Sequence, residues 1–131
     1  MTQPEVSAVE RTIQAYFAAT RAMDRDAWVR CFCADAVSID PVGAPPLRGH
    51  AALGQFFDGI VGMASTIGLM EERVHLCGDQ AAIPWIGRGV GRANGKPFVF
   101  EGVDVMFFDA EGKIRELHAY WNPAALMAQL A

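Results

Sequence analysis

The stretch KPFVFEGVDVMFF, residues 96–108, alternates between two sets of side chains, as a long β-strand does. One face of this strand carries Phe98, Phe100, Gly102, Asp104, Met106 and Phe108. An acidic side chain is therefore expected on a face that is otherwise apolar and aromatic. This face predicts both a buried sheet surface and an unusual carboxyl group within it.

The neighbouring segments also have the features of strands. Residues 67–77, 80–92 and 113–121 are apolar segments separated from one another and from residues 97–108 by GD, NG and DAEG. Such short polar and glycine-containing links are typical of hairpins. We therefore expect consecutive strands to pair antiparallel.

The first half of the chain predicts three helices. Residues 5–22 place Tyr16 on the inward stripe of an amphipathic helix that begins with Val6 and Val9. Residues 25–32, RDAWVRCF, form a second helix capped by Asp24 and anchored by Trp28 and Phe32. VSID, residues 37–40, is a short strand, and residues 50–62 carry apolar side chains at helical spacing.

These elements predict one domain, residues 1–131, of the α+β class. Three N-terminal helices would pack on one face of a strongly curved, mainly antiparallel sheet. No second domain is needed for a chain of 131 residues.

The composition excludes several kinds of partner. A formal net charge of −4 gives no basic surface for nucleic acid or for an anionic membrane. No stretch reaches the roughly 18 apolar residues of a membrane span, and the first residues do not have the pattern of a signal peptide, so a cytoplasmic protein is expected. Cys31, Cys33 and Cys77 are an odd number, and Cys31 and Cys33 are too close in sequence for a disulfide scaffold, so reduced thiols are expected. A metal site is not expected either, because the three histidines form no recognised spacing with them.

Asp104 has two interpretations. An ionised carboxylate on an apolar face loses hydration and needs a partner, which Arg88 or Arg92 could supply as an ion pair. Alternatively, the acid stays protonated and donates a hydrogen bond. The pattern leaves both open.

Asp40 stands at the end of a predicted strand, in IDPVG, before a loop rich in proline and glycine. The common role for aspartate before proline is an Asx-type turn. The alternative is a carboxylate at the mouth of a pocket, where Pro41 and Gly43 shape the turn and the side chain can accept a proton.

Together, QAYFAA around Tyr16, IDPVG around Asp40, GVDVMFF around Asp104 and AYWNP around Trp121 resemble the ketosteroid isomerase (steroid Δ-isomerase) family of the NTF2-like superfamily. The resemblance extends over nearly the whole chain. It implies a cone-shaped fold with an apolar cavity, usually a homodimer, that moves a double bond of a 3-oxo steroid into conjugation without a cofactor or metal.

The resemblance also implies roles for individual residues. Asp40 would be the general base, and Tyr16 and Asp104 would donate hydrogen bonds to the oxyanion. Phe100, Met106 and Trp121 are expected to form an apolar wall for the substrate, and Phe57 is expected to contact it.

Two positions differ from the family pattern. Phe32 and Phe57 stand where some members have tyrosines that support the tyrosine of the first helix, and both phenylalanines also fit plain core roles. Two other functions stay open: a polyketide cyclase or epoxide hydrolase on the same fold, and a protein that only binds flat apolar ligands. A binder has little reason to place both Asp40 and Asp104 in its cavity.

Overall fold

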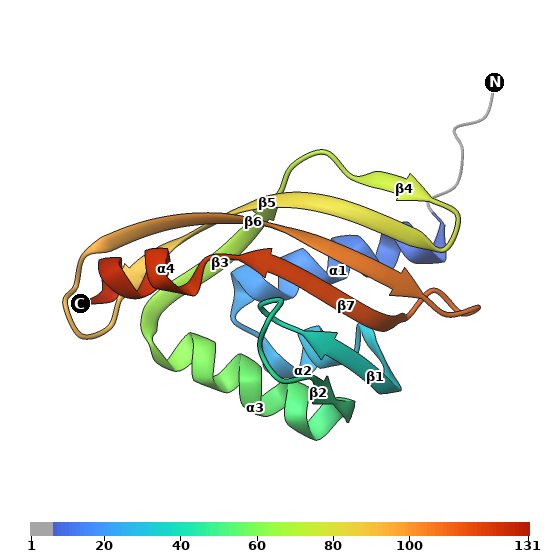
Figure 1. Cartoon of the computed structure of the whole chain (residues 1–131), viewed down its shortest axis with the longest axis horizontal. Helices are drawn as coiled ribbons and strands as arrows, with labels where there is room; N and C mark the ends of the chain where they lie inside the picture. The colour runs from blue at the N-terminus through green and yellow to red at the C-terminus, as the bar shows by residue number, and fades with distance from the viewer. Residues whose placement is uncertain (1–6) are drawn as a thin grey trace.

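The computed structural model describes residues 7–131. The helices in this part of the chain are α1 (Ala8–Ala22), α2 (Arg25–Val29), α3 (Gly49–Gly62) and α4 (Pro123–Leu130). The strands are β1 (Phe32–Ile39), β2 (Leu47–Arg48), β3 (Ala64–Glu71), β4 (His75–Cys77), β5 (Gln80–Gly91), β6 (Pro97–Phe108) and β7 (Ile114–Trp121). Figure 1 shows α1, α2 and α3 on one side of a curved sheet, which confirms the α+β prediction.

Helix α1 begins and ends with recognisable caps. Ser7 and Glu10 form a capping box, in which the Glu10 backbone N–H donates to Ser7 Oγ at 3.1 Å. Met23 closes the helix in the left-handed conformation, with φ of 53°. Tyr16 lies on the buried face, as expected. Residues 5–6 of the predicted helix, including Val6, lie outside the described residues.

Helix α2 is shorter than predicted. Asp24 caps it, accepting from the Ala27 N–H at 3.1 Å, but the helix ends at Val29 rather than at residue 32. Phe32 already belongs to β1, because the backbone there pairs with β7, where Phe32 lies opposite Ile114. The predicted strand at residues 37–40 is therefore the second half of a longer strand.

The sheet has the order β2-β1-β7-β6-β5-β3, and β4 pairs with β5 beside this path. All strand pairs in the described part are antiparallel except β1 with β7, which is parallel. The links GD, NG and DAEG join β4 to β5, β5 to β6 and β6 to β7, as predicted. The parallel pair joins β1 and β2 to the antiparallel strands β7, β6, β5 and β3.

The predicted strand at residues 67–77 is in fact two strands. Glu71 in β3 lies opposite Trp85, and His75 in β4 lies opposite Ala82, so both strands pair with β5. Between them, Pro84 of β5 accepts a bond from the Glu72 N–H at 2.8 Å but has no N–H to return. The ladder is interrupted at this proline.

A fourth helix, α4, is not among the three expected from the sequence. Asn122 caps it, accepting from the Ala124 N–H at 3.0 Å. Gln129 Nε2 donates to the Val99 carbonyl at 2.8 Å, which ties the helix to β6. Its Leu126 is buried, so α4 closes one end of the sheet.

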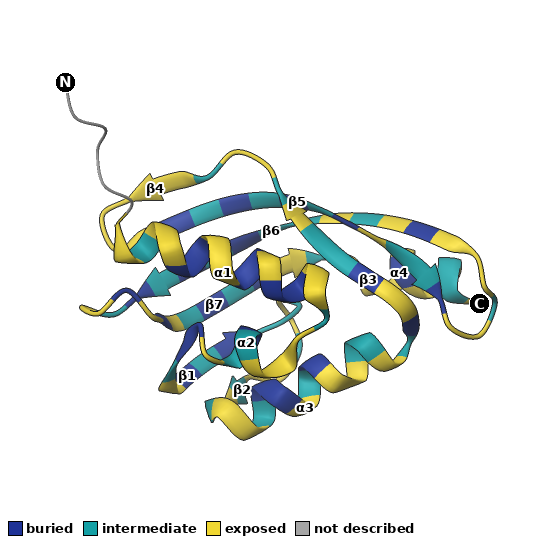
Figure 2. Ribbon diagram, turned by 180° about the vertical axis from the view of Figure 1, so that it is seen from behind, coloured by how far each residue is buried: buried dark blue, intermediate teal, exposed yellow. Residues whose placement is uncertain are grey.

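The inner face of β6 is buried in the predicted alternation. Phe98, Asp104, Met106 and Phe108 are buried and Phe100 is half-buried, whereas Val99 and Glu101 on the other face are exposed. Figure 2 shows buried residues alternating with intermediate ones along β5, and with exposed or intermediate ones along β6. The acid predicted from the pattern thus lies inside the molecule.

Candidate active site

A cavity of about 610 Å³, its open mouth included, lies between the helices and the inner face of the sheet. Its lining is mostly apolar and aromatic, and consists of Tyr16, Thr20, Trp28, Asp40, Phe56, Phe57, Ile60, Val61, Ile67, Gly68, Leu69, Trp85, Phe100, Asp104, Trp121 and Leu126.

Six of the seven predicted site residues meet in this cavity. Tyr16 comes from α1, Phe57 from α3, Phe100 and Asp104 from β6, Trp121 from the end of β7, and Asp40 from the residue after β1.

Met106 is the exception among the predicted residues. It faces the same side of β6 as Asp104 but is fully buried in the main core and is not part of the cavity lining. The inward face of β6 is a cavity wall at Asp104 and closed core at Met106. The expected substrate contact at Met106 is therefore not supported by its position.

Asp104 is 1% exposed and has a single hydrogen bond within the described chain: Trp85 Nε1 donates to its Oδ1 at 3.0 Å. Its Oδ2 has no hydrogen-bond partner. Burial, followed by the charge of Asp40, raises the pKa of Asp104 to about 8, although the bond from Trp85 and the nearby Tyr16 hydroxyl act to lower it. Asp104 is therefore mostly protonated at neutral pH.

The ion-pair interpretation of Asp104 is wrong. None of the salt bridges between described residues involves Asp104. Arg88 is exposed, and Arg92 donates instead to the carbonyls of Gly62 and Ala64, at 3.1 and 3.0 Å. The partner is an uncharged indole, so no opposite charge offsets the loss of hydration that an ionised Asp104 would suffer.

Asp40 is half-buried and accepts a hydrogen bond from Trp121 Nε1 at 2.6 Å. The turn after it rests on backbone bonds, since the Ala44 N–H donates to the Pro41 carbonyl at 3.0 Å, so the carboxylate is not used as a turn cap. Burial raises the pKa of Asp40 to about 6, while the bond from Trp121 lowers it. Asp40 is therefore mostly ionised at neutral pH.

Tyr16 is 2% exposed and remains neutral. Burial, followed by the negative charges of Asp104 and Asp40, raises the pKa of Tyr16 well above its ordinary value. Its hydroxyl lies near the Asp104 carboxyl but completes no hydrogen bond to Oδ2. Both groups are thus available to a third oxygen.

The two phenylalanines that replace tyrosines in the family pattern have different positions. Phe32 is buried in the core, with its ring centroid 6.1 Å from that of Tyr16. Phe57 is also buried but lines the cavity. Neither can donate a hydrogen bond to Tyr16.

Trp85 is the main residue of this site that the sequence interpretation missed. It is 2% exposed and contacts Asp104 diagonally across the β5–β6 pair, in which Ile83 lies opposite Asp104. The alternation of Ala81, Ile83 and Trp85 places the indole on the inner face. Which polar group the indole reaches depends on the strand register, which the sequence does not state.

Within residues 7–131, no group of three or more His, Cys, Asp and Glu side chains is arranged to hold a metal ion. None of the helices in the described region combines the length and the apolar composition needed to cross a membrane.

Comparison with known proteins places the chain in a family. Residues 13–117 match the SnoaL-like domain. A steroid Delta-isomerase from Nocardioides simplex is 30% identical over 119 residues, which are 91% of this chain and 94% of that protein.

Two solved structures share the fold. The epoxide hydrolase/cyclase-like enzyme SalBIII, described for pyran ring formation in polyether salinomycin, has a TM-score of 0.79 and 23% identity, covering 88% of this chain and 92% of that one. A hypothetical protein with a ketosteroid isomerase-like fold from Catenulispora acidiphila, solved with trimethylamine, has a TM-score of 0.80 and 19% identity, covering 98% and 93%. The chain therefore belongs to the SnoaL-like domain family of the NTF2-like superfamily and is a homologue of steroid Delta-isomerase over most of its length.

Proposed function

We propose that this protein is a cofactor-independent isomerase that moves a β,γ double bond of a 3-oxo steroid into conjugation with the ketone. The observation that carries the proposal is a pair of carboxyls in one aromatic cavity whose pKa values are raised to different extents, to about 6 for Asp40 and about 8 for Asp104. Such a pair supplies a base and a neutral acid at the same pH.

Asp40 is the general base in this proposal. Its carboxylate takes a proton from the carbon between the ketone and the alkene, and the electron pair of that C–H bond moves into a dienolate. The resulting Asp40 acid then returns the proton to the far carbon of the former alkene. The substrate and one carboxyl supply every proton and electron pair, so the reaction balances without another reactant.

Tyr16 and Asp104 stabilise the charge that develops on the ketone oxygen. Both are neutral donors at pH 7 in a cavity that excludes much of the water, where fixed donors act strongly on developing charge. Asp104 Oδ2 has no partner within the described chain, and a substrate oxygen would satisfy it.

The aromatic lining fits a flat, apolar substrate. Phe100 stands edge-on between Trp85 and Trp121, with ring centroids 5.2 and 5.8 Å away, and Trp28 stacks on Phe56 at 6.4 Å. These side chains offer rigid apolar walls for fused rings. The steroid is the substrate that the homologue's activity suggests.

An isomerase assay tests the proposal. The purified protein alone should convert a 3-oxo-Δ5 steroid into the conjugated 3-oxo-Δ4 product, followed by the absorbance of the conjugated enone. Asp40→Asn should remove most of this activity. Asp58→Asn is its matched control, because it makes the same substitution at an exposed acid on α3 outside the cavity, and it should react like the wild type. No product above the buffer rate would refute the proposal. If epoxide opening or ring closure of a linear precursor were found instead, the cyclase or hydrolase interpretation would replace it.

A homodimer is part of the same proposal. Val99, Tyr120 and Met70, all on strands, are about half exposed and would be available to a second copy. Analytical ultracentrifugation should give twice the mass of one chain, and a single-chain mass at micromolar concentration would contradict this expectation.

A further inference from the structure

We propose that Trp85 is a positioning residue for Asp104: its indole N–H holds Oδ1, so that the proton of the neutral acid lies on Oδ2 and is offered to an oxygen of the ligand. This inference rests on the proposed function, because it concerns one of the two donors to the substrate oxygen. It adds a residue, and an orientation, that the roles of Tyr16, Asp40 and Asp104 leave undefined.

The argument begins with what an indole can do. Its N–H donates and cannot accept, so Oδ1 must be an acceptor in both protonation states of Asp104. In a carboxylic acid the carbonyl oxygen is the better acceptor, and the proton is on the other oxygen. The bond from Trp85 therefore selects Oδ1 as the carbonyl oxygen and Oδ2 as the hydroxyl.

Asp104 Oδ2 then holds a proton that has no acceptor among the described residues. The other titratable groups lining the cavity are Tyr16, from α1, and Asp40, after β1. The strands on either side of β6 place Ile83 and Ala119 opposite Asp104, and neither can accept a side-chain hydrogen bond. A ligand oxygen in the cavity would provide the acceptor.

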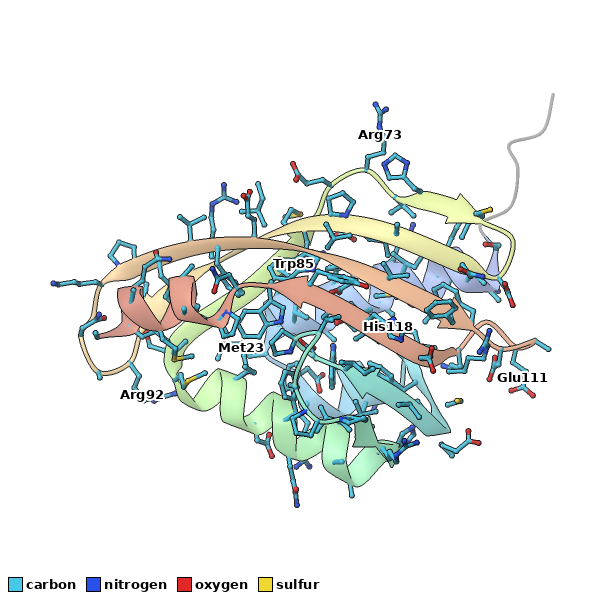
Figure 3. All side chains as sticks on the ribbon, in the orientation of Figure 1. Met23, Arg73, Trp85, Arg92, Glu111 and His118 are labelled. Carbon is cyan, nitrogen blue, oxygen red and sulfur yellow. The ribbon has the colours of Figure 1, made fainter. Side chains whose placement is uncertain are left out.

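The position of Trp85 is itself well defined. The indole lies near the middle of the curved sheet, where it is labelled in Figure 3. Gly102 is directly opposite Trp85 in the β5–β6 pair, and a Cβ at Gly102 would lie 2.6 Å from Trp85 Cζ2. Phe100 packs edge-on against the indole, with an interplanar angle of 77°. The glycine gives room for the ring, and the phenylalanine limits its movement.

The bond from Trp85 also affects the pKa of Asp104. A donor to Oδ1 also stabilises the ionised form, so Trp85 lowers the pKa of Asp104 from the value that burial alone would give. The bond that orients the Asp104 carboxyl therefore also makes it easier for this carboxyl to lose its proton. Removal of the indole N–H should produce an acid that is protonated over a wider pH range but is less well oriented.

Trp85→Phe tests whether the indole N–H both orients Asp104 and lowers its pKa, since phenylalanine keeps an aromatic ring against Phe100 but has no N–H. We expect the plateau of kcat to fall about tenfold, the size of effect expected for one hydrogen bond at a reacting group, with KM changed less. We also expect the alkaline limb of the kcat profile to move to higher pH. Trp121→Phe is the matched comparison: it removes the indole N–H that bonds Asp40, and it should move the acidic limb while leaving the alkaline limb in place.

Two kinetic results would overturn the inference. If the alkaline limb does not move, the indole does not act on Asp104. If the limb moves but the plateau is unchanged, the bond exists without positioning the acid.

A measurement on the unmodified protein covers the case in which Trp85→Phe fails to fold or the protein proves not to be an isomerase. In ¹⁵N-labelled, ligand-free wild type, the indole N–H resonance of Trp85 should shift with pH along the titration of the Asp104 carboxyl, and that of Trp121 should follow the titration of Asp40 instead. If the Trp85 resonance did not shift with the Asp104 titration, the contact would be refuted, whatever the outcome of the steroid assay. If the protein were an active isomerase but the Trp85 resonance did not shift, this inference would be refuted and the proposed function would stand.

Discussion

The two carboxyls of the cavity occupy very different parts of the chain. Asp104 lies in the middle of β6, with β5 and β7 paired on either side. Asp40 follows the last residue of β1 and precedes a loop that extends to β2 at Leu47. A hydrogen-bond donor benefits from a fixed position, whereas a base that moves a proton between two carbons must reach both. The backbone at each site suits the role proposed for its side chain.

At both sites an indole N–H donates a hydrogen bond to the carboxyl. Trp85 donates to Asp104 at 3.0 Å, and Trp121 donates to Asp40 at 2.6 Å. Their pKa values still differ, at about 8 and about 6, because Asp104 is more deeply buried and is also repelled by Asp40. Depth in the cavity and the charge of Asp40, rather than the kind of partner, therefore separate the two pKa values.

The largest effect is expected when the base is removed. Asp40→Asn keeps the shape and the contact with Trp121 but cannot accept the substrate proton, so kcat should fall by roughly 10²–10⁴-fold. Steady-state kinetics with the steroid would measure this loss, and an equilibrium titration should show that binding survives. Turnover within a factor of three of wild type would exclude Asp40 as the base.

The second effect concerns stability. The pKa of Asp104 is about 8 in the folded state and about 4 when unfolded, so the folded chain binds more protons between these values and wild type loses stability as the pH rises from 4 towards 8. Asparagine stays neutral, so the advantage of Asp104→Asn should grow over this range. At pH 7 the advantage is at most about 4 kcal/mol, or three pKa units.

Denaturant unfolding of both proteins at pH 5 and pH 7 would measure this difference. The contribution of Asp40 is present in both proteins and cancels in the comparison. An asparagine variant that is much less stable than wild type at pH 7 would mean that Asp104 is ionised and paired in the folded protein.

The third effect separates the donor from the charge. Asp104→Ala removes the donor to the substrate oxygen and should lower kcat on the order of 10²-fold, whereas Asp104→Asn still carries an N–H donor and should keep much of the activity. The two variants are compared in the same steroid assay. Equal losses in both would indicate that a titratable acid, and not merely a neutral donor, is required at this position.

The smallest effect is expected at Trp121. Trp121→Phe keeps an aromatic wall but removes the donor that lowers the pKa of Asp40, so the acidic limb of the kcat profile should move to higher pH. At pH 8 the rate should change only a few-fold, and at pH 6 the loss should be larger. A pH profile that overlays the wild type would show that the indole does not influence the base.

The sequence predicted the parts of this molecule that depend on local pattern. The alternation of residues 96–108 placed Asp104 on a buried face, and helical spacing placed Tyr16 inward, as the structure has them. Local pattern did not predict the structure where pairing between distant strands determines it. Phe32 fitted a helix until its pairing with Ile114 put it in β1, and the parallel pairing of β1 with β7 has no local sign.

The candidate site was predictable to a similar degree. Side-chain alternation cannot distinguish Asp104, at the cavity, from Met106, in the core, because both face inward and only the covering elements differ. It also could not choose between an arginine and Trp85 as the partner of Asp104, since both choices depend on strand register. Helix α4 was equally hidden, because eight residues are too few for a clear helical period.

The most direct test of the whole account is a ¹³C NMR titration of the aspartate carboxyls in the ligand-free protein, assigned with Asp40→Asn and Asp104→Asn. Two carboxyls should titrate far above the ordinary range, Asp40 at about 6 and Asp104 at about 8, so that one is ionised and the other protonated at pH 7. If both titrated near 4, or if Asp104 ionised before Asp40, the division into base and neutral donor would be contradicted.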